Sequence, residues 1–131
     1  MTWPSVYLAL LLSHLAGDFL LQTQWQAMNK RRGDGPDPEQ RRALTLHALT
    51  YTAAYIPALI WLGGEVGALA AAAGALAITL PHVFIDDGRF LRAWLSRVKH
   101  NDAPETWLVA AVDQTFHLVC LLPVAVVIAT A

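Results

Sequence analysis

Histidine and aspartate recur four residues apart inside apolar sequence, and this repeat is the first indication of chemistry in the chain. Three pairs have this spacing: His14 with Asp18, His82 with Asp86 and, in reverse order, Asp113 with His117. A fourth histidine, His47, lies in the remaining apolar segment. Four residues is slightly more than one helical turn, so each pair projects from one helix face. Ionisable groups in membrane helices normally face the bundle interior and one another. The spacing therefore predicts a buried cluster of imidazoles and carboxylates.

Such a cluster has the donor chemistry of a metal site, because neutral imidazoles and carboxylates bind Zn²⁺, Mn²⁺, Fe²⁺ or Ni²⁺. A bound cation would also offset the buried carboxylate charge. We expect one or two divalent transition-metal ions, with the ligands drawn from His14, Asp18, His47, His82, Asp86, Asp113 and His117. Seven groups exceed one tetrahedral shell, so either two ions bind or some groups orient the ligands. Three further polar residues are expected to orient the ligands by hydrogen bonds without binding the ion themselves: Gln22, Tyr51 and Gln114.

The composition indicates that membrane-spanning helices position this cluster. Of the 131 residues, 56% are hydrophobic and only 15% are charged, against roughly 25% charged in an average soluble domain. The mean hydropathy is +0.42. We predict an all-α integral membrane bundle, a single domain over residues 1–131, with helices at residues 3–28, 43–62, 66–86 and 106–130. A short amphipathic helix over residues 89–99 is predicted to lie in the membrane interface.

Local signals refine the predicted helix ends. Asp37 and Pro38 are typical of a helix start, with Asp37 as the N-cap and Gln40 as the partner in a capping box. Pro57 predicts a kink in the second span, and residues 63–65 predict a tight turn after it. Gly17, beside the first His–Asp pair, predicts a close approach by a neighbouring helix.

The basic residues set the expected topology. All nine Lys and Arg residues fall between the first and second spans or between the third and fourth. The positive-inside tendency then places residues 29–42 in the cytoplasm and both termini outside, in a multi-pass protein of the bacterial inner membrane. Counting about 1.5 Å per residue puts every His and Asp of the cluster in the cytoplasmic half of its helix. Polar residues scattered without a common purpose would have no reason to agree in depth across four helices.

A family resemblance rests on the same residues. The motifs SHLAGDFLLQTQW (residues 13–25), HVFID (residues 82–86) and DQTFH (residues 113–117), with the isolated His47 and Tyr51, resemble a family of small membrane proteins of bacteria and their phages. This family is catalogued as a domain of unknown function; the resemblance implies a four-helix membrane protein and no particular activity. A looser similarity, in residue types more than in motifs, links the chain to predicted membrane-bound metal-dependent hydrolases.

Three functional hypotheses follow from the residues. The first is a metal-dependent hydrolase acting on a lipid or phosphoester at the cytoplasmic leaflet, with Asp18, Asp86 or Asp113 as the base. The second is transport of a metal ion or of protons, and the third is a structural protein held by His–Asp hydrogen bonds. The outer halves of the helices are almost entirely apolar, which favours a one-sided site over a path through the membrane.

The partners expected from the sequence are membrane lipids, with a second copy of the chain kept as a candidate. A net charge of −1 gives no basic field for nucleic acid, so none is expected as a partner.

Overall fold

The structure is a computed structural model that describes residues 1–31 and 37–131, and in these parts the chain forms helices and no strands. The elements in order are α1 (Trp3–Leu15), the π-helix η1 (Ala16–Leu21), α2 (Gln24–Asn29), α3 (Pro38–Ala54), α4 (Ile56–Val66), α5 (Ala68–Asp86), α6 (Arg89–Arg97) and α7 (Thr106–Thr130). Three stretches are long and apolar enough to cross a membrane: α1 with η1, α5 and α7. The pair α3 and α4 makes a fourth candidate span, bent by 52°. The predicted all-α membrane bundle is confirmed.

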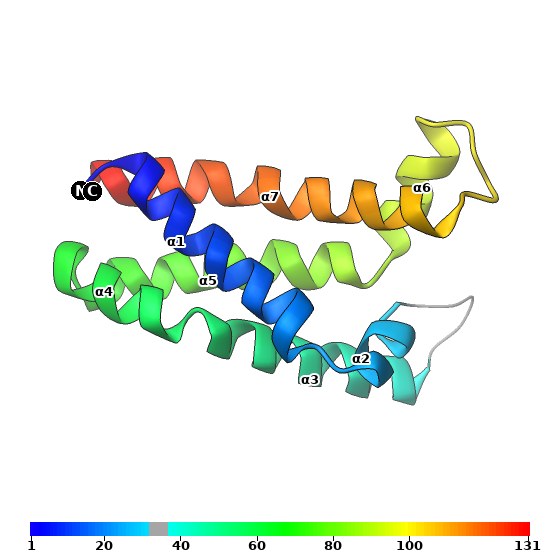
Figure 1. Ribbon diagram of the computed structural model, residues 1–131, viewed down its shortest axis with the longest axis horizontal. Coiled ribbons are helices and arrows are strands. Elements are labelled where there is room, and N and C mark those ends of the chain that lie inside the picture. Colours follow the sequence, from blue (N-terminus) through cyan, green and yellow to red (C-terminus); the bar gives the residue numbers. More distant parts are fainter. Residues whose placement is uncertain (32–36) are drawn as a thin grey trace.

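The spans lie side by side, and the two chain ends meet at one end of the bundle (Figure 1). The short helices α2 and α6 lie at the opposite end. Helix α7 packs against α1 and α5, α4 packs against α5, and α3 packs against η1, α2 and α5. An even number of spans is required for the termini to share one end, which agrees with the four predicted crossings.

The distribution of side chains is the reverse of that in a soluble protein. Large apolar residues cover the outside; Leu20 and Leu69, for example, are 80% and 86% exposed. All four histidines of the predicted cluster are buried inside. Lipid is as apolar as leucine, so such an exterior is stable only where hydrocarbon surrounds it. The fold therefore has the surface of a membrane protein.

The first predicted span, residues 3–28, is divided in the structure. The helix ends at Leu21, Gln22 is extended, and α2 begins again at Gln24. The cause is a reciprocal capping box: the Thr23 hydroxyl accepts from the Gln26 backbone N–H, and the Gln26 side chain accepts from the Thr23 N–H. Gln22, predicted to support the ligands, therefore lies in the break after the helical segment that carries His14 and Asp18.

The second and third predicted spans differ from the structure at their ends. The predicted kink lies at Tyr55, between α3 and α4, two residues before Pro57. The helix then continues through residues 63–65 to Val66, and the chain turns at Gly67 instead.

The start of α3 is partly as predicted. Asp37 caps it by accepting a hydrogen bond from the Glu39 N–H, whereas Gln40 forms no capping box and donates to the Lys30 carbonyl. Of residues 29–42, predicted to lie in the cytoplasm, residues 32–36 lie outside the described residues. The amphipathic stretch forms α6, whose Leu91 and Leu95 are buried against the bundle.

Candidate metal centre

The seven predicted ligand side chains meet at one level of the bundle, and we call them the polar cluster: His14, Asp18, His47, His82, Asp86, Asp113 and His117. None of the seven is more than 7% exposed. They come from α1, η1, α3, α5 and α7, so the cluster forms only when all four spans pack together. The convergence that metal binding requires is therefore present, while metal ligation by these residues remains a prediction.

Gly17 lets α3 approach η1 closely enough to close the cluster. A Cβ atom at Gly17 would lie 2.7 Å from the Tyr51 ring and 3.3 Å from the Tyr51 Cα. This confirms the close approach predicted at Gly17. The Tyr51 ring in turn stacks on the His82 imidazole, with a centroid separation of 3.4 Å and an interplanar angle of 6°. Single-turn π-helical segments such as η1 often occur at functional sites, and this one carries Asp18.

Asp86 is the most crowded carboxylate of the cluster. Its Oδ2 lies 3.0 Å from His47 Nε2, 3.0 Å from His82 Nε2 and 2.8 Å from the Lys30 Nζ. The two imidazole nitrogens are themselves 3.0 Å apart. Four polar atoms thus share one small buried space.

Lys30 belongs to this space, although it falls in residues 29–42, the segment predicted to lie in the cytoplasm. It is 4% exposed, and its ammonium group has three acceptors: Gln22 Oε1 at 2.6 Å, Asp86 Oδ2 at 2.8 Å and His47 Nε2 at 3.2 Å. An ammonium group has three protons, so its donor capacity is filled. The break at Gln22 and Thr23 makes this possible, because it turns α2 back toward the bundle.

Arg31 was missed in the same way. Its Nη2 lies 3.3 Å from Asp113 Oδ2. Lys30 and Arg31 supply two positive charges against the three aspartates, which leaves one negative charge when the histidines are neutral. A signal existed in the sequence: three carboxylates in apolar helices require nearby cations, and these two basic residues follow the first span directly.

Gln114 joins the remaining histidine to Asp18. Its Oε1 accepts from His14 Nε2 at 3.0 Å, and its amide nitrogen donates to Asp18 Oδ2 at 3.0 Å. An amide oxygen can only accept, so His14 carries its proton on Nε2. His14 Nδ1 then accepts from the Tyr51 hydroxyl at 3.1 Å. Both ring nitrogens of His14 are occupied.

His117 has the opposite arrangement. Its Nδ1 donates to the backbone carbonyl of Asp113 at 2.9 Å, which places the lone pair on Nε2. This Nε2 has no hydrogen-bond partner among the described residues, and neither do Asp86 Oδ1 and Asp113 Oδ1. A histidine whose second nitrogen is bonded to a carbonyl is the usual form of a metal ligand. Buried acceptors without partners are costly, and these three atoms have the chemistry to hold a cation.

Three groups in the described part of the chain bring ligand atoms within 4.8 Å of one another: His14–Asp18–His82, His47–His82–Asp86 and Asp86–Asp113–His117. They share His82 and Asp86, so they are not three independent sites. Hydrogen bonds occupy both nitrogens of His14 in the first, and the Lys30 ammonium contacts two members of the second. In the described chain, every member of the His47–His82–Asp86 group also has a buried atom without a hydrogen-bond partner, but Lys30 contacts both His47 and Asp86 there. The Asp86–Asp113–His117 group has such an atom on each residue, and of its three members only Asp86 contacts Lys30. It fits a divalent ion best.

Comparison with known proteins gives one match. A family described as "Protein of unknown function (DUF3307)" matches residues 6–131, nearly the whole chain. No curated protein and no solved structure matches it. What the polar cluster does must therefore be inferred from its geometry.

Proposed function

The chain belongs to the family of proteins of unknown function DUF3307, and we propose that it is a membrane protein that binds one divalent transition-metal ion within the bundle. Asp86, Asp113 and His117 would hold the ion. The proposal is carried by two observations. The three residues bring ligand atoms within 4.8 Å of one another, and each has a buried acceptor without a hydrogen-bond partner among the described residues. One ion, rather than two, is proposed because Lys30 already neutralises the opposite side of Asp86.

The reaction that we propose for this site is metal-dependent hydrolysis of a phosphoester at the cytoplasmic leaflet. Three protein ligands leave coordination positions open, as in catalytic sites. A bound ion would activate water and polarise the phosphoryl group. In the proposed reaction the water oxygen bonds to phosphorus as the ester P–O bond breaks. Asp18, whose Oδ1 has no hydrogen-bond partner in the described chain, takes the water proton and returns it to the leaving alkoxide, which departs as an alcohol.

A one-sided site supports this reaction over transport. Beyond the polar cluster, toward the chain termini, the interior is filled by buried apolar residues that include Val6, Leu10, Leu62, Ala125 and Ile128. A transported ion would have to cross this layer, where it would meet no ligand among these side chains. We place the protein in the bacterial inner membrane with both termini outside, so that the cluster lies on the side of the basic residues.

Metal analysis of the detergent-purified protein tests the proposal. Wild-type protein should carry about one equivalent of zinc, manganese, iron or nickel. Asp113→Ala and His117→Ala should lose it, whereas His100→Ala, which changes an exposed histidine outside the cluster, should retain it. Added metal should raise the thermal stability of emptied wild-type protein, because a ligand of the folded state stabilises that state. Protein that carries no metal and shows no such stabilisation with any of the four ions would contradict the proposal.

A further inference from the structure

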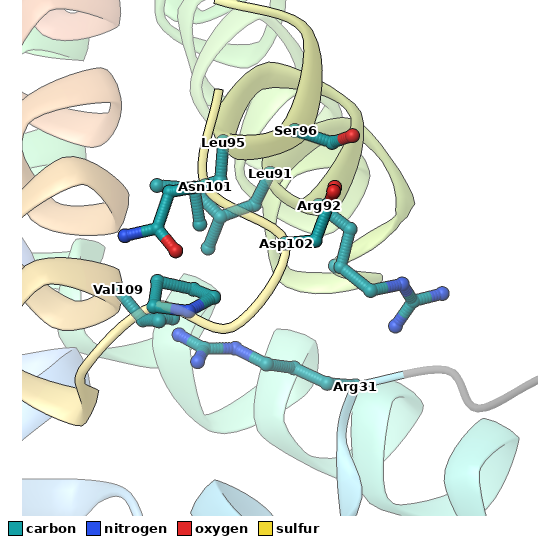
Figure 2. Close-up of a pocket in the computed structure, with 10 residues that line it drawn as sticks. Arg31, Leu91, Arg92, Leu95, Ser96, Asn101, Asp102 and Val109 are labelled. Atoms are coloured by element: carbon teal, nitrogen blue, oxygen red, sulfur yellow. The ribbon is translucent and has the colours of Figure 1, made fainter. Parts of the chain in front are cut away.

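A pocket lies between α6, the loop that follows it and the start of α7 (Figure 2). This is the end of the bundle away from the chain termini (Figure 1). Its volume is about 220 Å³. Leu91, Leu95 and Val109 give it an apolar floor, and Arg31 runs along one side (Figure 2). Arg92 and Ser96 are among the lining residues of α6. Asp102 also lines the pocket, so the lining carries two arginines and one carboxylate. An apolar floor beside a net positive charge suits a ligand that has both an apolar part and an anionic part.

The pocket shares its walls with the proposed metal site. Gly88 lines the pocket two residues after Asp86, and Val109 lines it one helical turn before Asp113. Arg31 belongs to both: it lines the pocket, and its Nη2 lies 3.3 Å from Asp113 Oδ2. A group bound to Arg31 would therefore lie next to a proposed metal ligand.

Gly88 has no side chain and so leaves room for the Arg31 side chain in this position. Gly88 has a φ of +81°, and a Cβ atom there would lie 3.2 Å from the Arg31 Cβ and 3.3 Å from its Cγ. The stem of Arg31 thus lies directly on the backbone at the start of α6. Its Nε is buried and has no hydrogen-bond partner among the described residues. The Arg31 side chain is 35% exposed and lines the pocket. A guanidinium group has five N–H donors, so beside its contact with Asp113 it has donors with which arginine recognises phosphate.

We propose that this pocket binds a phosphate ester or free phosphate through Arg31 and delivers it to the Asp86–Asp113–His117 group. The proposal rests on the proposed function for the second step only, because binding of the anion to Arg31 needs no metal. The apolar floor accommodates the first carbons of a lipid, so the phosphate head group of an anionic lipid should bind more tightly than inorganic phosphate.

Isothermal titration calorimetry of the full chain in detergent tests the proposal, with dihexanoyl phosphatidic acid and inorganic phosphate as the two probes. The wild-type protein should bind at least one probe saturably, both when loaded with metal and after metal removal. Tighter binding of the lipid identifies a head-group site, and binding of inorganic phosphate alone identifies a free-phosphate site; either result supports the pocket. Arg31→Gln should weaken binding about tenfold or more, the scale of a hydrogen bond to a charged group.

Three further variants separate recognition from folding and from general charge. Arg31→Lys keeps the charge but loses the planar fork, so it should bind with intermediate affinity. Ser96→Trp should weaken binding by filling the pocket, with Arg31 left intact. Arg97→Gln removes an exposed charge from the same helix outside the pocket and should change the affinity less than about twofold.

The outcomes distinguish this proposal from the proposed function. If metal binds but neither probe saturates, or if Arg31→Gln and Ser96→Trp bind as wild type does, the pocket proposal is overturned and the metal site stands. If the probes bind at Arg31 and no metal is found, the pocket stands and the metal proposal is lost.

Discussion

The two halves of this bundle are built from the same helices but are held together differently. The half near the termini packs apolar side chains such as Leu10, Leu62 and Ile128. The other half buries three aspartates, four histidines and a lysine. Hydrogen bonds inside membranes average about 0.6 kcal/mol, whereas a central Asp costs about 2.5–3.5 kcal/mol on insertion scales. The apolar half shows that this chain can join its helices without charges, so adhesion alone does not account for the polar half.

The largest effect is expected from breaking the Lys30–Asp86 pair. Asp86→Leu leaves the Lys30 ammonium buried without its carboxylate, which should lower the free energy of unfolding by about 3–5 kcal/mol. Chemical unfolding of metal-free protein in detergent measures this. The double variant Asp86→Leu with Lys30→Met removes both charges and should recover most of the loss. A cost below about 1 kcal/mol for Asp86→Leu would mean that the pair does not hold the polar half.

A cavity in the apolar half should have a smaller and separate effect. Leu62 is fully buried there, and Leu62→Ala should cost about 2 kcal/mol, the low end of the range for core leucines. The low end is expected because lipid offers the unfolded helices other apolar surroundings. Metal content should be unchanged. Loss of metal in this variant, measured after the same purification, would show that the two halves are not independent.

Gln114 offers a test within the polar half that changes no charge. Its amide positions His14 and Asp18 and lies 3.4 Å from Asp113 Oδ2. Gln114→Leu should weaken metal affinity about 10-fold, because Gln114 contacts the proposed ligand Asp113 and loss of a group that orients a ligand typically has this effect. Metal competition with a chelator measures the change. Affinity equal to that of wild type would indicate that the His14–Gln114–Asp18 chain plays no part in metal binding.

The sidedness of the two halves can be tested without perturbing either. With Cys120→Ser as background, a cysteine at Thr2 should react with a membrane-impermeant reagent added to intact cells. A cysteine at Asp37, which is exposed at the other end, should react only after permeabilisation. Thr2→Cys should change stability by less than about 0.5 kcal/mol, whereas Asp37→Cys removes the N-cap of α3 and should cost about 1 kcal/mol. The reverse labelling pattern would place the polar half on the outer side.

The sequence by itself determined the spans and the depth of the cluster. Apolar runs long enough to cross a bilayer predict the helices, and the four-residue spacing of His14–Asp18, His82–Asp86 and Asp113–His117 predicts which faces turn inward. Both are one-dimensional properties, because helix rise and helix period convert position in the chain directly into depth and direction.

Only the tertiary structure decided which atoms meet. The break after Leu21 turns α2 back and brings Lys30 to Asp86, and a local capping box at Thr23 outweighs the apolar period that predicts one continuous helix to residue 28. The partners of His14 likewise come from other helices: Gln114 of α7 fixes its proton on Nε2, and the Tyr51 hydroxyl of α3 donates to its Nδ1. A hydrogen bond between two helices requires their atoms to be placed to within a few tenths of an ångström. The spacing of residues along one helix does not predict that placement.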